Sequence, residues 1–351
     1  MSIPLKAVIV GCGGMAEHWL KSAVEVPDIQ LVGFVDVNVA AANARRDQFA
    51  PNAVTGNDLG QMLQQTQADI VFDVAIPEAH HAITLTALAQ GCHVLGEKPL
   101  ANSMAEAHEM VAAAEKAGKL FAVIQNRRYM EPIQRLREFL ATGQLGQLTT
   151  VNCDFYIGAH FGGFRDHMQH VLLLDMAIHT FDQARFLTQT DPTAVLFAKE
   201  WNPVGSWYDH DASAIAIFEM SAKTGQIDKS DGKVIYTYRG SWCAEGANTT
   251  WEADWRVIGT HGSVRWNGGE QIQVELVAEP GGFISKTKSV DLPSLTDSCK
   301  TQGHRSLIAE FAECVREKKI PDTIAKDNIK SLSMVFGAIE SATLGKRIEL
   351  A

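Results

Sequence analysis

Over the first 125 residues, short apolar segments alternate with longer segments whose apolar residues recur every three or four positions. Uninterrupted apolar runs of this length are typical of parallel strands that are covered on both faces. The amphipathic segments between them predict helices. The predicted strands are 5–10, 30–36, 70–74, 93–96 and 121–124, and the predicted helices are 15–24, 39–49, 58–64, 80–90 and 103–117.

Local signals support these helices. Ser103 and Glu106 form a capping-box pattern at the start of the last one, and Gly91 and Gly118 follow two of the helices where a left-handed residue commonly ends them. Regular alternation of strand and helix predicts an α/β domain with a doubly wound parallel sheet.

After residue 126 the pattern changes. A helix at 130–142, a strand at 148–156 and a long helix at 170–187 precede a run of strands and two closing helices. The strands are 194–201, 212–219, 234–242, 251–259, 263–266 and 272–278, and the helices are 304–317 and 325–344. Strands in series with segregated helices predict an α+β domain with a large, mainly antiparallel open sheet. We therefore expect two domains, 1–126 and 127–351.

A glycine-rich turn joins the first strand to the first helix. It reads Gly11-Cys12-Gly13-Gly14-Met15-Ala16. In such a turn Gly11 permits the tight bend, Gly13 lets a pyrophosphate approach the backbone, and Ala16 keeps helix and strand close. The helix N-terminus then offers its amides to the phosphates.

Asp36 ends the second strand, twenty residues beyond Ala16. A carboxylate there accepts hydrogen bonds from the ribose hydroxyls and repels a 2′-phosphate, which predicts NAD rather than NADP. A chance glycine turn could explain the glycines alone. With a strand before, a helix after and Asp36 in place, we interpret the N-terminal domain as a Rossmann dinucleotide-binding domain.

Candidate catalytic residues occur in both predicted domains. Lys98, in Glu97-Lys98-Pro99, follows the strand 93–96 and so lies at the carboxyl edge of the sheet, where a nicotinamide binds. Asp175 and His179, four residues apart on an apolar helix, share one face. Alcohol oxidation needs a base such as histidine, a carboxylate to orient it, and a cation to stabilise alkoxide charge. A structural Asp–His pair in the core explains the pair equally well by itself.

In this order, the glycine turn, Asp36, Glu97-Lys98-Pro99 and the Asp175–His179 spacing resemble the glucose–fructose oxidoreductase, inositol dehydrogenase and rhizopine-catabolism family (Gfo/Idh/MocA). Weaker similarities lie at 77–81, at 125–132 and in the closing helices, so the resemblance covers nearly the whole chain. It implies a Rossmann domain joined to a domain whose open sheet shields the site and forms oligomer contacts. It further implies that Lys98 lies near the nicotinamide, and that the bond before Pro99 is often cis.

The expected site combines these arguments. The catalytic group is Lys98, Asp175 and His179, and these residues contact the substrate together with Tyr156, Arg165 and His167. The expected cofactor contacts are Gly11, Cys12, Gly13, Gly14, Met15, Ala16, Asp36, Ile76, Pro77, His81, Glu97, Lys98 and Asn126.

Two features leave questions open. Bulky residues at 166–171 stand where many family members carry a Gly-Gly-Gly run, so close sugar relatives cannot supply the substrate. His167 and His170, spaced i, i+3 on a helix, with His160 nearby, also allow a metal-site hypothesis that would use Asp175 and His179 as further ligands. The dehydrogenase hypothesis already uses those two residues, so we expect no metal.

Composition narrows the alternatives. The 351 residues carry a formal net charge of −10 with no basic run, which argues against nucleic-acid and anionic-membrane partners. No apolar run approaches a membrane span, and the apolar start at 7–10 is too short for a secretion signal. The six scattered cysteines favour a reducing cytoplasm over a disulfide framework.

Tryptophans at 242, 251, 255 and 266 fall in the predicted sheet. We interpret them as the covering of a sheet face at a subunit interface, with the core as the alternative. We expect a homodimer or homotetramer formed through this sheet.

The sequence thus predicts an NAD-dependent dehydrogenase that acts on a secondary alcohol of a small sugar, sugar derivative or cyclitol. One alternative is a glycosidase of the same fold that recycles its NAD. The other is a non-catalytic sugar or dinucleotide sensor, against which the full set of Lys98, Asp175 and His179 argues.

Overall fold

The computed structural model describes residues 3–222, 232–295 and 298–350. The chain divides into two compact units, Met1–Tyr129 with Cys299–Ile329, and Met130–Ser298 with Lys330–Ala351. The sequence analysis divided the chain once, after residue 126. In the structure residues 299–329 cluster with the first unit, because their apolar side chains join its core.

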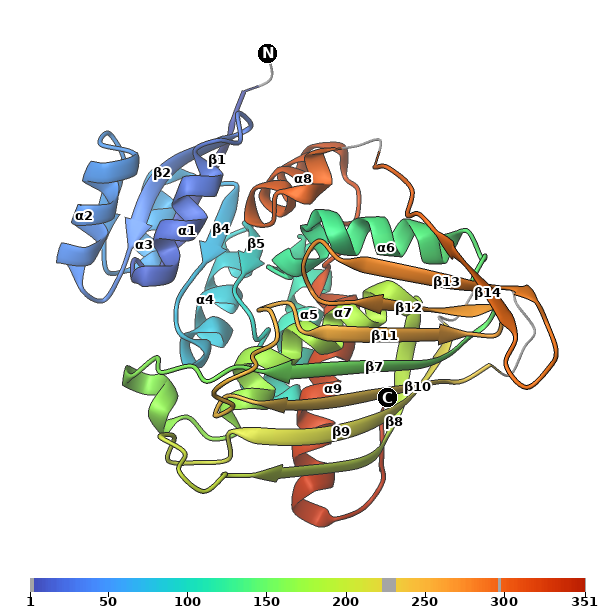
Figure 1. Ribbon diagram of the computed structural model, residues 1–351. Coiled ribbons are helices and arrows are strands. Elements are labelled where there is room, and N and C mark those ends of the chain that lie inside the picture. The colour runs from blue at the N-terminus through green and yellow to red at the C-terminus, as the bar shows by residue number, and fades with distance from the viewer. Residues whose placement is uncertain (1–2, 223–231, 296–297, 351) are drawn as a thin grey trace. The chain divides into compact units, whose positions relative to one another are not determined.

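The first unit is built on a six-stranded sheet in the order β3-β2-β1-β4-β5-β6, and every neighbouring pair is parallel (Figure 1). The strands are β1 (Leu5–Val10), β2 (Ile29–Val35), β3 (Val54–Gly56), β4 (Ile70–Asp73), β5 (His93–Gly96) and β6 (Phe121–Val123). This order is that of a doubly wound sheet, which carries helices on both faces. The predicted parallel sheet is confirmed. The three-residue β3 was not predicted, because it is too short to show a pattern.

Helices connect these strands, and one helix from near the end of the chain also belongs to this unit. They are α1 (Gly14–Ala23), α2 (Val39–Phe49), α3 (Leu59–Thr66), α4 (Pro77–Ala89), α5 (Met104–Ala117) and α8 (His304–Glu317). Ser103 caps α5 by accepting a hydrogen bond from the Glu106 amide at 3.2 Å, as its sequence pattern predicts. Leu307, Ile308 and Phe311 of α8 pack into the core that Trp19 of α1 occupies.

The second unit holds a nine-stranded sheet in the order β14-β13-β12-β11-β7-β10-β9-β8-β15. Its strands are β7 (Leu148–Tyr156), β8 (Thr190–Trp201), β9 (Ser213–Ala222), β10 (Val234–Ser241), β11 (Asp254–Gly259), β12 (Gly262–Trp266), β13 (Ile272–Glu279), β14 (Lys286–Val290) and β15 (Ile348–Glu349). Among the described strands of this sheet, only the β7–β10 pair is parallel. The predicted large, mainly antiparallel sheet is therefore confirmed.

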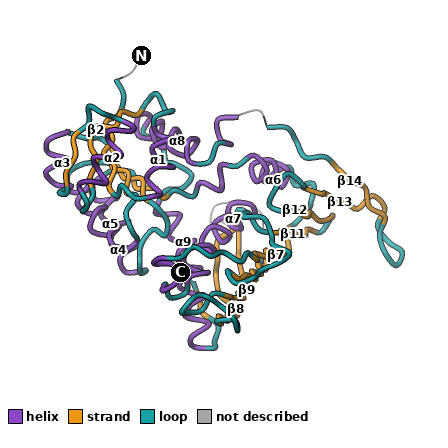
Figure 2. Tube along the Cα trace, turned by 60° about the vertical axis from the view of Figure 1, so that its left-hand side comes forward, coloured by secondary structure: helices purple, strands orange, loops and turns teal. Residues whose placement is uncertain are grey.

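Helices lie against one face of this sheet, and the other face is open (Figures 1 and 2). They are α6 (Glu131–Ala141), a π-helical segment (Leu172–Ala177) that runs into α7 (Ile178–Thr188), and α9 (Ala325–Leu344), within which the boundary between the units falls. Among the described residues, no helix is long and apolar enough to cross a membrane.

Aromatic rings form a row across the sheet of the second unit. Phe218, Tyr236, Trp255 and Trp266, from four strands, stack with neighbouring ring centres 5.7 to 6.3 Å apart. These rings are buried within the chain, and Trp242 is only 1% exposed. The interface interpretation is therefore wrong for Trp242, Trp255 and Trp266, and the core alternative holds. Strand alternation turns Trp255 and Trp266 toward the interior.

Candidate active site

Gly11 and Gly13 meet different surroundings in the turn between β1 and α1. Gly11 has φ +87°, and a Cβ there would lie 2.6 Å from the backbone of Val74 and Ala75, just after β4. At Gly13 a Cβ would meet no heavy atom of the described residues within 4 Å, its chain neighbours apart. The fold itself therefore requires glycine at position 11. Position 13 instead keeps an open space where a phosphate group could rest against the backbone.

The N-terminus of α1 is suited to bind an anion. Its N-cap residue, Gly13, provides no side chain to bond the first-turn amides. Such amides and the positive end of the helix dipole attract phosphate. Ala16 is fully buried, as the predicted close packing of helix against strand requires.

Asp36 follows β2 and is tied to the glycine turn. Its Oδ2 accepts a hydrogen bond from the Cys12 amide and its Oδ1 accepts one from the Asn38 amide, both at 2.7 Å. A carboxylate oxygen has a second lone pair, so each oxygen can also accept a ribose hydroxyl. The open space at Gly13, the uncapped helix end and this fixed carboxylate together fit a bound dinucleotide.

Arg45 of α2 also braces this turn, although the sequence analysis did not single it out. Its guanidinium donates to the Gly13 carbonyl at 3.2 Å and pairs with Glu17 of α1 at 3.0 Å. Nothing in the local sequence around Arg45 indicates this role, because its partners lie about thirty positions away.

Glu97 orients the segment that carries Lys98. It is 8% exposed, and its Oε1 accepts a hydrogen bond from the Trp19 indole at 2.7 Å. Its Oε2 accepts one from the Lys98 amide at 3.0 Å. The Lys98–Pro99 bond is cis, as the resemblance implied. The predicted cofactor contact of Glu97 stays a prediction.

Other predicted cofactor residues lie at the same edge of the sheet. Ile76 and Pro77 follow β4, and Asn126 begins the turn after β6. His81 lies on the surface of α4 and pairs with Glu109 of α5 at 2.9 Å. The structure thus gathers the first-unit residues where strands end, and their contacts with cofactor stay predictions.

The sequence analysis missed a buried ion pair beside them. His80 Nδ1 lies 2.9 Å from Asp73 Oδ2, and the two side chains are only 2% and 1% exposed. Burial opposes protonation of His80, but the Asp73 carboxylate outweighs it and raises the pKa of His80. The signal in the sequence is an aspartate that ends an apolar strand, seven positions before a histidine in the next helix.

In the second unit, Asp175 and His179 lie on either side of a change in helix type. Asp175 belongs to the π-helical segment, and His179 is the second residue of α7 and 7% exposed. The predicted helix 170–187 is present, but its turns are wider at 172–177, where it is π-helical. π-Helical segments are rare and often occur at functional sites. Every residue of α7 is buried.

The structure places Arg165 against Asp175. Its Nε donates to Oδ2 at 2.8 Å and its Nη2 donates to Oδ1 at 3.3 Å. The guanidinium also lies over the rings of Phe161 and Phe164, 5.0 and 4.8 Å from their centres. The sequence predicted a substrate contact for Arg165 and gave no sign of this ion pair.

The neighbouring histidines pair with separate carboxylates. His160 contacts Glu245 at 2.9 Å, His167 contacts Asp209 at 2.5 Å and His170 contacts Glu200 at 2.8 Å. Hydrogen bonds to these carboxylates raise the pKa values of His167 and His170. Within the described part of the chain, no group of three or more His, Cys, Asp or Glu side chains could hold a metal ion.

Tyr156, another predicted substrate contact, ends β7, and burial raises its pKa. Lys98 belongs to the first unit, whereas Asp175, His179 and Tyr156 belong to the second. The assembly of the catalytic group thus stays a prediction.

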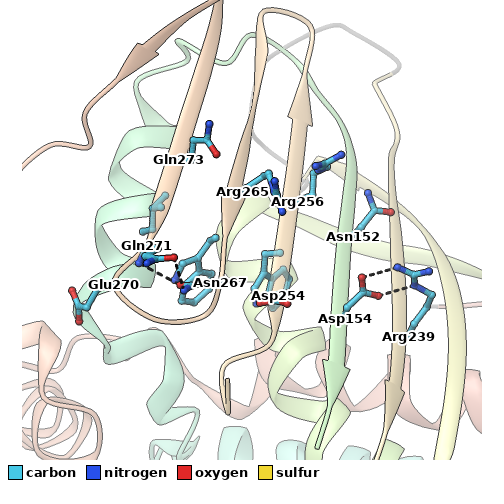
Figure 3. Close-up of a pocket in the computed structure, with 13 residues that line it drawn as sticks. Asn152, Asp154, Arg239, Asp254, Arg256, Arg265, Asn267, Glu270, Gln271 and Gln273 are labelled. Carbon is cyan, nitrogen blue, oxygen red and sulfur yellow. Dashed lines mark hydrogen bonds and ion pairs between the residues drawn. The ribbon is translucent and has the colours of Figure 1, made fainter. Parts of the chain in front are cut away.

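A cavity of about 800 Å³ lies on the open face of the second unit's sheet (Figure 3). Charged and polar side chains dominate its lining, and Arg239 forms a two-point ion pair with Asp154 at 2.6 Å. None of the predicted catalytic residues lines this cavity.

Two family models match the chain. Residues 5–125 match the oxidoreductase family with an NAD-binding Rossmann fold, and residues 133–265 match the GFO/IDH/MocA C-terminal domain. Over 352 residues, the chain is 23% identical to a D-apiose dehydrogenase of Rhizobium rhizogenes, covering 99% of this chain and 97% of that protein. Over 211 residues it is 28% identical to a D-glucoside 3-dehydrogenase of Escherichia coli, covering 58% and 60%.

Among solved structures, an oxidoreductase from Agrobacterium radiobacter in complex with NAD⁺, L-tartaric acid and magnesium is similar in fold, with a TM-score of 0.82. It is 20% identical, and the match covers 98% of each chain. The two family models together match most of the chain. The protein therefore belongs to the GFO/IDH/MocA family of oxidoreductases, and its first unit contains the NAD-binding Rossmann domain of that family.

Proposed function

We propose that this oxidoreductase uses NAD to oxidise a secondary alcohol of a sugar, sugar derivative or cyclitol, or to reduce the matching ketone. The observation that carries the proposal is the pairing of a dinucleotide frame with Lys98. Gly13 and Asp36 provide the frame, and Glu97 fixes the backbone of Lys98 at the carboxyl edge of the same sheet. Relatives named as dehydrogenases of D-apiose and D-glucosides support the substrate class.

Oxidation removes a hydride from the carbinol carbon and a proton from its oxygen. Bound NAD supplies the nicotinamide that accepts the hydride. The Lys98 ammonium stabilises negative charge on the reacting oxygen, and His179 accepts the proton. Asp175 orients His179 for this proton transfer. A cationic lysine and a nearly buried histidine suit these roles, since charge interactions are stronger where water is excluded.

The test is a screen of polyols, sugars and cyclitols with NAD, followed by NADH absorbance. Lys98→Ala should retain NAD binding and lose about 10²- to 10⁴-fold in turnover, the usual contribution of a proton-transfer or charge-stabilising group. Lys326→Ala is a matched control, because Lys326 is an exposed lysine of the same unit that pairs with Glu115. Near-normal turnover of Lys98→Ala would exclude the role of Lys98.

Each alternative gives a distinct result. A glycosidase that recycles NAD would release sugar without net NADH, which product analysis detects. A sensor would bind NAD and a sugar without turning either over.

We further propose that the open sheet joins subunits into a homodimer or homotetramer. Phe197 and Trp201 of β8 are 48% and 42% exposed, and exposed aromatic residues are enriched at interfaces. Light scattering measures the subunit number, and a monomer would exclude this proposal. Cys12, Cys92, Cys243 and Cys314 are free thiols, which supports a cytoplasmic location.

A further inference from the structure

Arg165 makes a two-point contact that fixes the direction of the Asp175 carboxylate. The two N–H···O bonds, of 2.8 and 3.3 Å, use both carboxylate oxygens. A single ammonium would fix one oxygen and leave the carboxylate free to turn, whereas a guanidinium fork sets its plane. The two side chains are 27% and 13% exposed, so solvent screens the pair only partly.

Aromatic contacts hold the guanidinium itself. Arg165 rests on the ring of Phe161. This ring contacts the indole of Trp242 edge-on, with the two ring centres 5.2 Å apart. Trp242 is 1% exposed and packs edge-on against Phe155 of β7 at 4.9 Å. A continuous series of contacts thus leads from the core of the sheet to Arg165. Aromatic faces attract guanidinium groups and restrict their motion.

The backbone of the same loop is tied to the sheet. The amides of Ile157 and Ala159 donate to Ser241 and Trp242, both at 3.1 Å, at the end of β10. Gly162 and Gly163, each with φ +70°, then turn the chain so that Phe161 and Phe164 both reach Arg165. The loop therefore presents Arg165 to Asp175 from a fixed base.

We propose that Arg165 is a positioning residue of this enzyme, which acts by holding Asp175 in the orientation that catalysis needs. This rests on the proposed role of Asp175. It replaces the direct substrate contact that the sequence suggested for Arg165, because its Nε and one terminal nitrogen bond Asp175 and its face rests on aromatic rings. The exposed His167 remains a candidate for that contact.

The experiment compares Arg165→Ala with Arg239→Ala. Arg239 makes the same kind of two-point pair, with Asp154, in a cavity whose lining includes none of the predicted catalytic residues, which makes it a matched control. We expect Arg165→Ala to lower kcat about 10²-fold, the scale of a misplaced catalytic group, with little change in KM. Added guanidinium should restore much of that kcat, and methylammonium should restore less because it cannot form the fork. Arg165→Lys should recover only part of the activity.

A rise in KM at unchanged kcat would assign Arg165 to substrate binding and overturn the proposal. Loss of kcat that guanidinium does not restore would also overturn it, as would an equal loss in Arg239→Ala.

A second measurement does not depend on turnover. Melting temperatures of Arg165→Ala, Asp175→Asn and the double variant form a cycle that reports whether the pair exists in solution. Shifts that are smaller in combination than their sum support the pair, and additive shifts refute it. If the pair is coupled but no polyol is oxidised, it is the proposed function that fails.

Discussion

Alanine substitutions at Gly11 and Gly13 separate a glycine that the fold needs from one that the cofactor needs. Gly11→Ala would place a methyl group at φ +87° and 2.6 Å from the backbone that follows β4. The left-handed conformation costs about 1–2 kcal/mol for a residue with a Cβ. The collision costs about 1–3 kcal/mol more, because only backbone can give way. We expect Gly11→Ala to destabilise the first unit by about 2–5 kcal/mol.

Gly13→Ala should leave the stability of the protein without cofactor nearly unchanged. Its φ of −75° suits alanine, and apart from its chain neighbours no heavy atom of the described residues lies within 4 Å of the added Cβ. Alanine lowers the free energy of unfolding by about 0.5–1 kcal/mol because it is a poorer N-cap than glycine. It raises the same free energy by about 0.4–1 kcal/mol because it restricts the unfolded chain. The same methyl group would occupy the space of the pyrophosphate. A clash of about 1.4–3 kcal/mol corresponds to roughly 10- to 100-fold weaker NAD binding.

The assay measures thermal unfolding without NAD and NAD affinity by calorimetry for both variants. A Gly13→Ala protein that binds NAD as tightly as the parent would show that the phosphates do not lie against position 13. A Gly11→Ala protein as stable as the parent would refute the steric argument for the turn.

Two further predictions concern the same unit. Asp36→Ala should weaken NAD and reduce discrimination against NADP, because the carboxylate that accepts ribose hydroxyls and repels a 2′-phosphate is gone; a parent that binds NADP more tightly than NAD in titration would contradict this. Burial, assisted by Lys119, lowers the pKa of His93 from 6.5 to about 4, so the unfolded chain binds a proton first and stability falls as the pH drops from about 6.5 to 4. His93→Asn keeps an acceptor for the Leu120 amide and should reduce the loss of stability between pH 7 and pH 4.5 by about 1–2 kcal/mol, less than a fully buried histidine would give because His93 is half-buried. Urea unfolding of the parent and the variant at both pH values measures this difference. An unchanged pH dependence of stability would exclude His93 as its source.

Local pattern predicted most of the Rossmann unit. The predicted strands 5–10 and 93–96 have the same bounds as β1 and β5. An apolar run between two turn signals is enough to predict where a buried strand begins and ends. The local pattern could not predict that residues 299–329 belong to the first unit. The apolar face of α8 predicts that the helix packs on a core, but not which of the two cores it joins. The short strands β14 and β15 also escaped, because each pairs at a sheet edge without a clear alternation.

The tryptophans carried a signal that was not used. In β11 and β12, Trp255 and Trp266 alternate with Arg256 and Arg265, and successive residues of a strand face opposite sides. A face that carries arginines is the poorer candidate for the core, so the tryptophans belong inside. The number of tryptophans in this region favoured a subunit interface. The alternation of tryptophan with arginine along each strand shows instead that these tryptophans belong to the core.

Each half of the proposed catalytic group is held by side chains that lie outside the motif that reveals it. Lys98 follows a glutamate that Trp19 fixes from α1, and Asp175 is held by an arginine ten positions earlier, which rests on Phe161. Hydride chemistry restricts the residue types at the reacting positions, whereas many arrangements can hold them. Motifs therefore identify the reaction and leave its supports to be found in three dimensions. The stretch 166–171, which lacks the family's glycine run, directly follows Arg165. A change of substrate through this loop must therefore preserve the hold on Asp175, which links specificity to catalytic geometry in one segment.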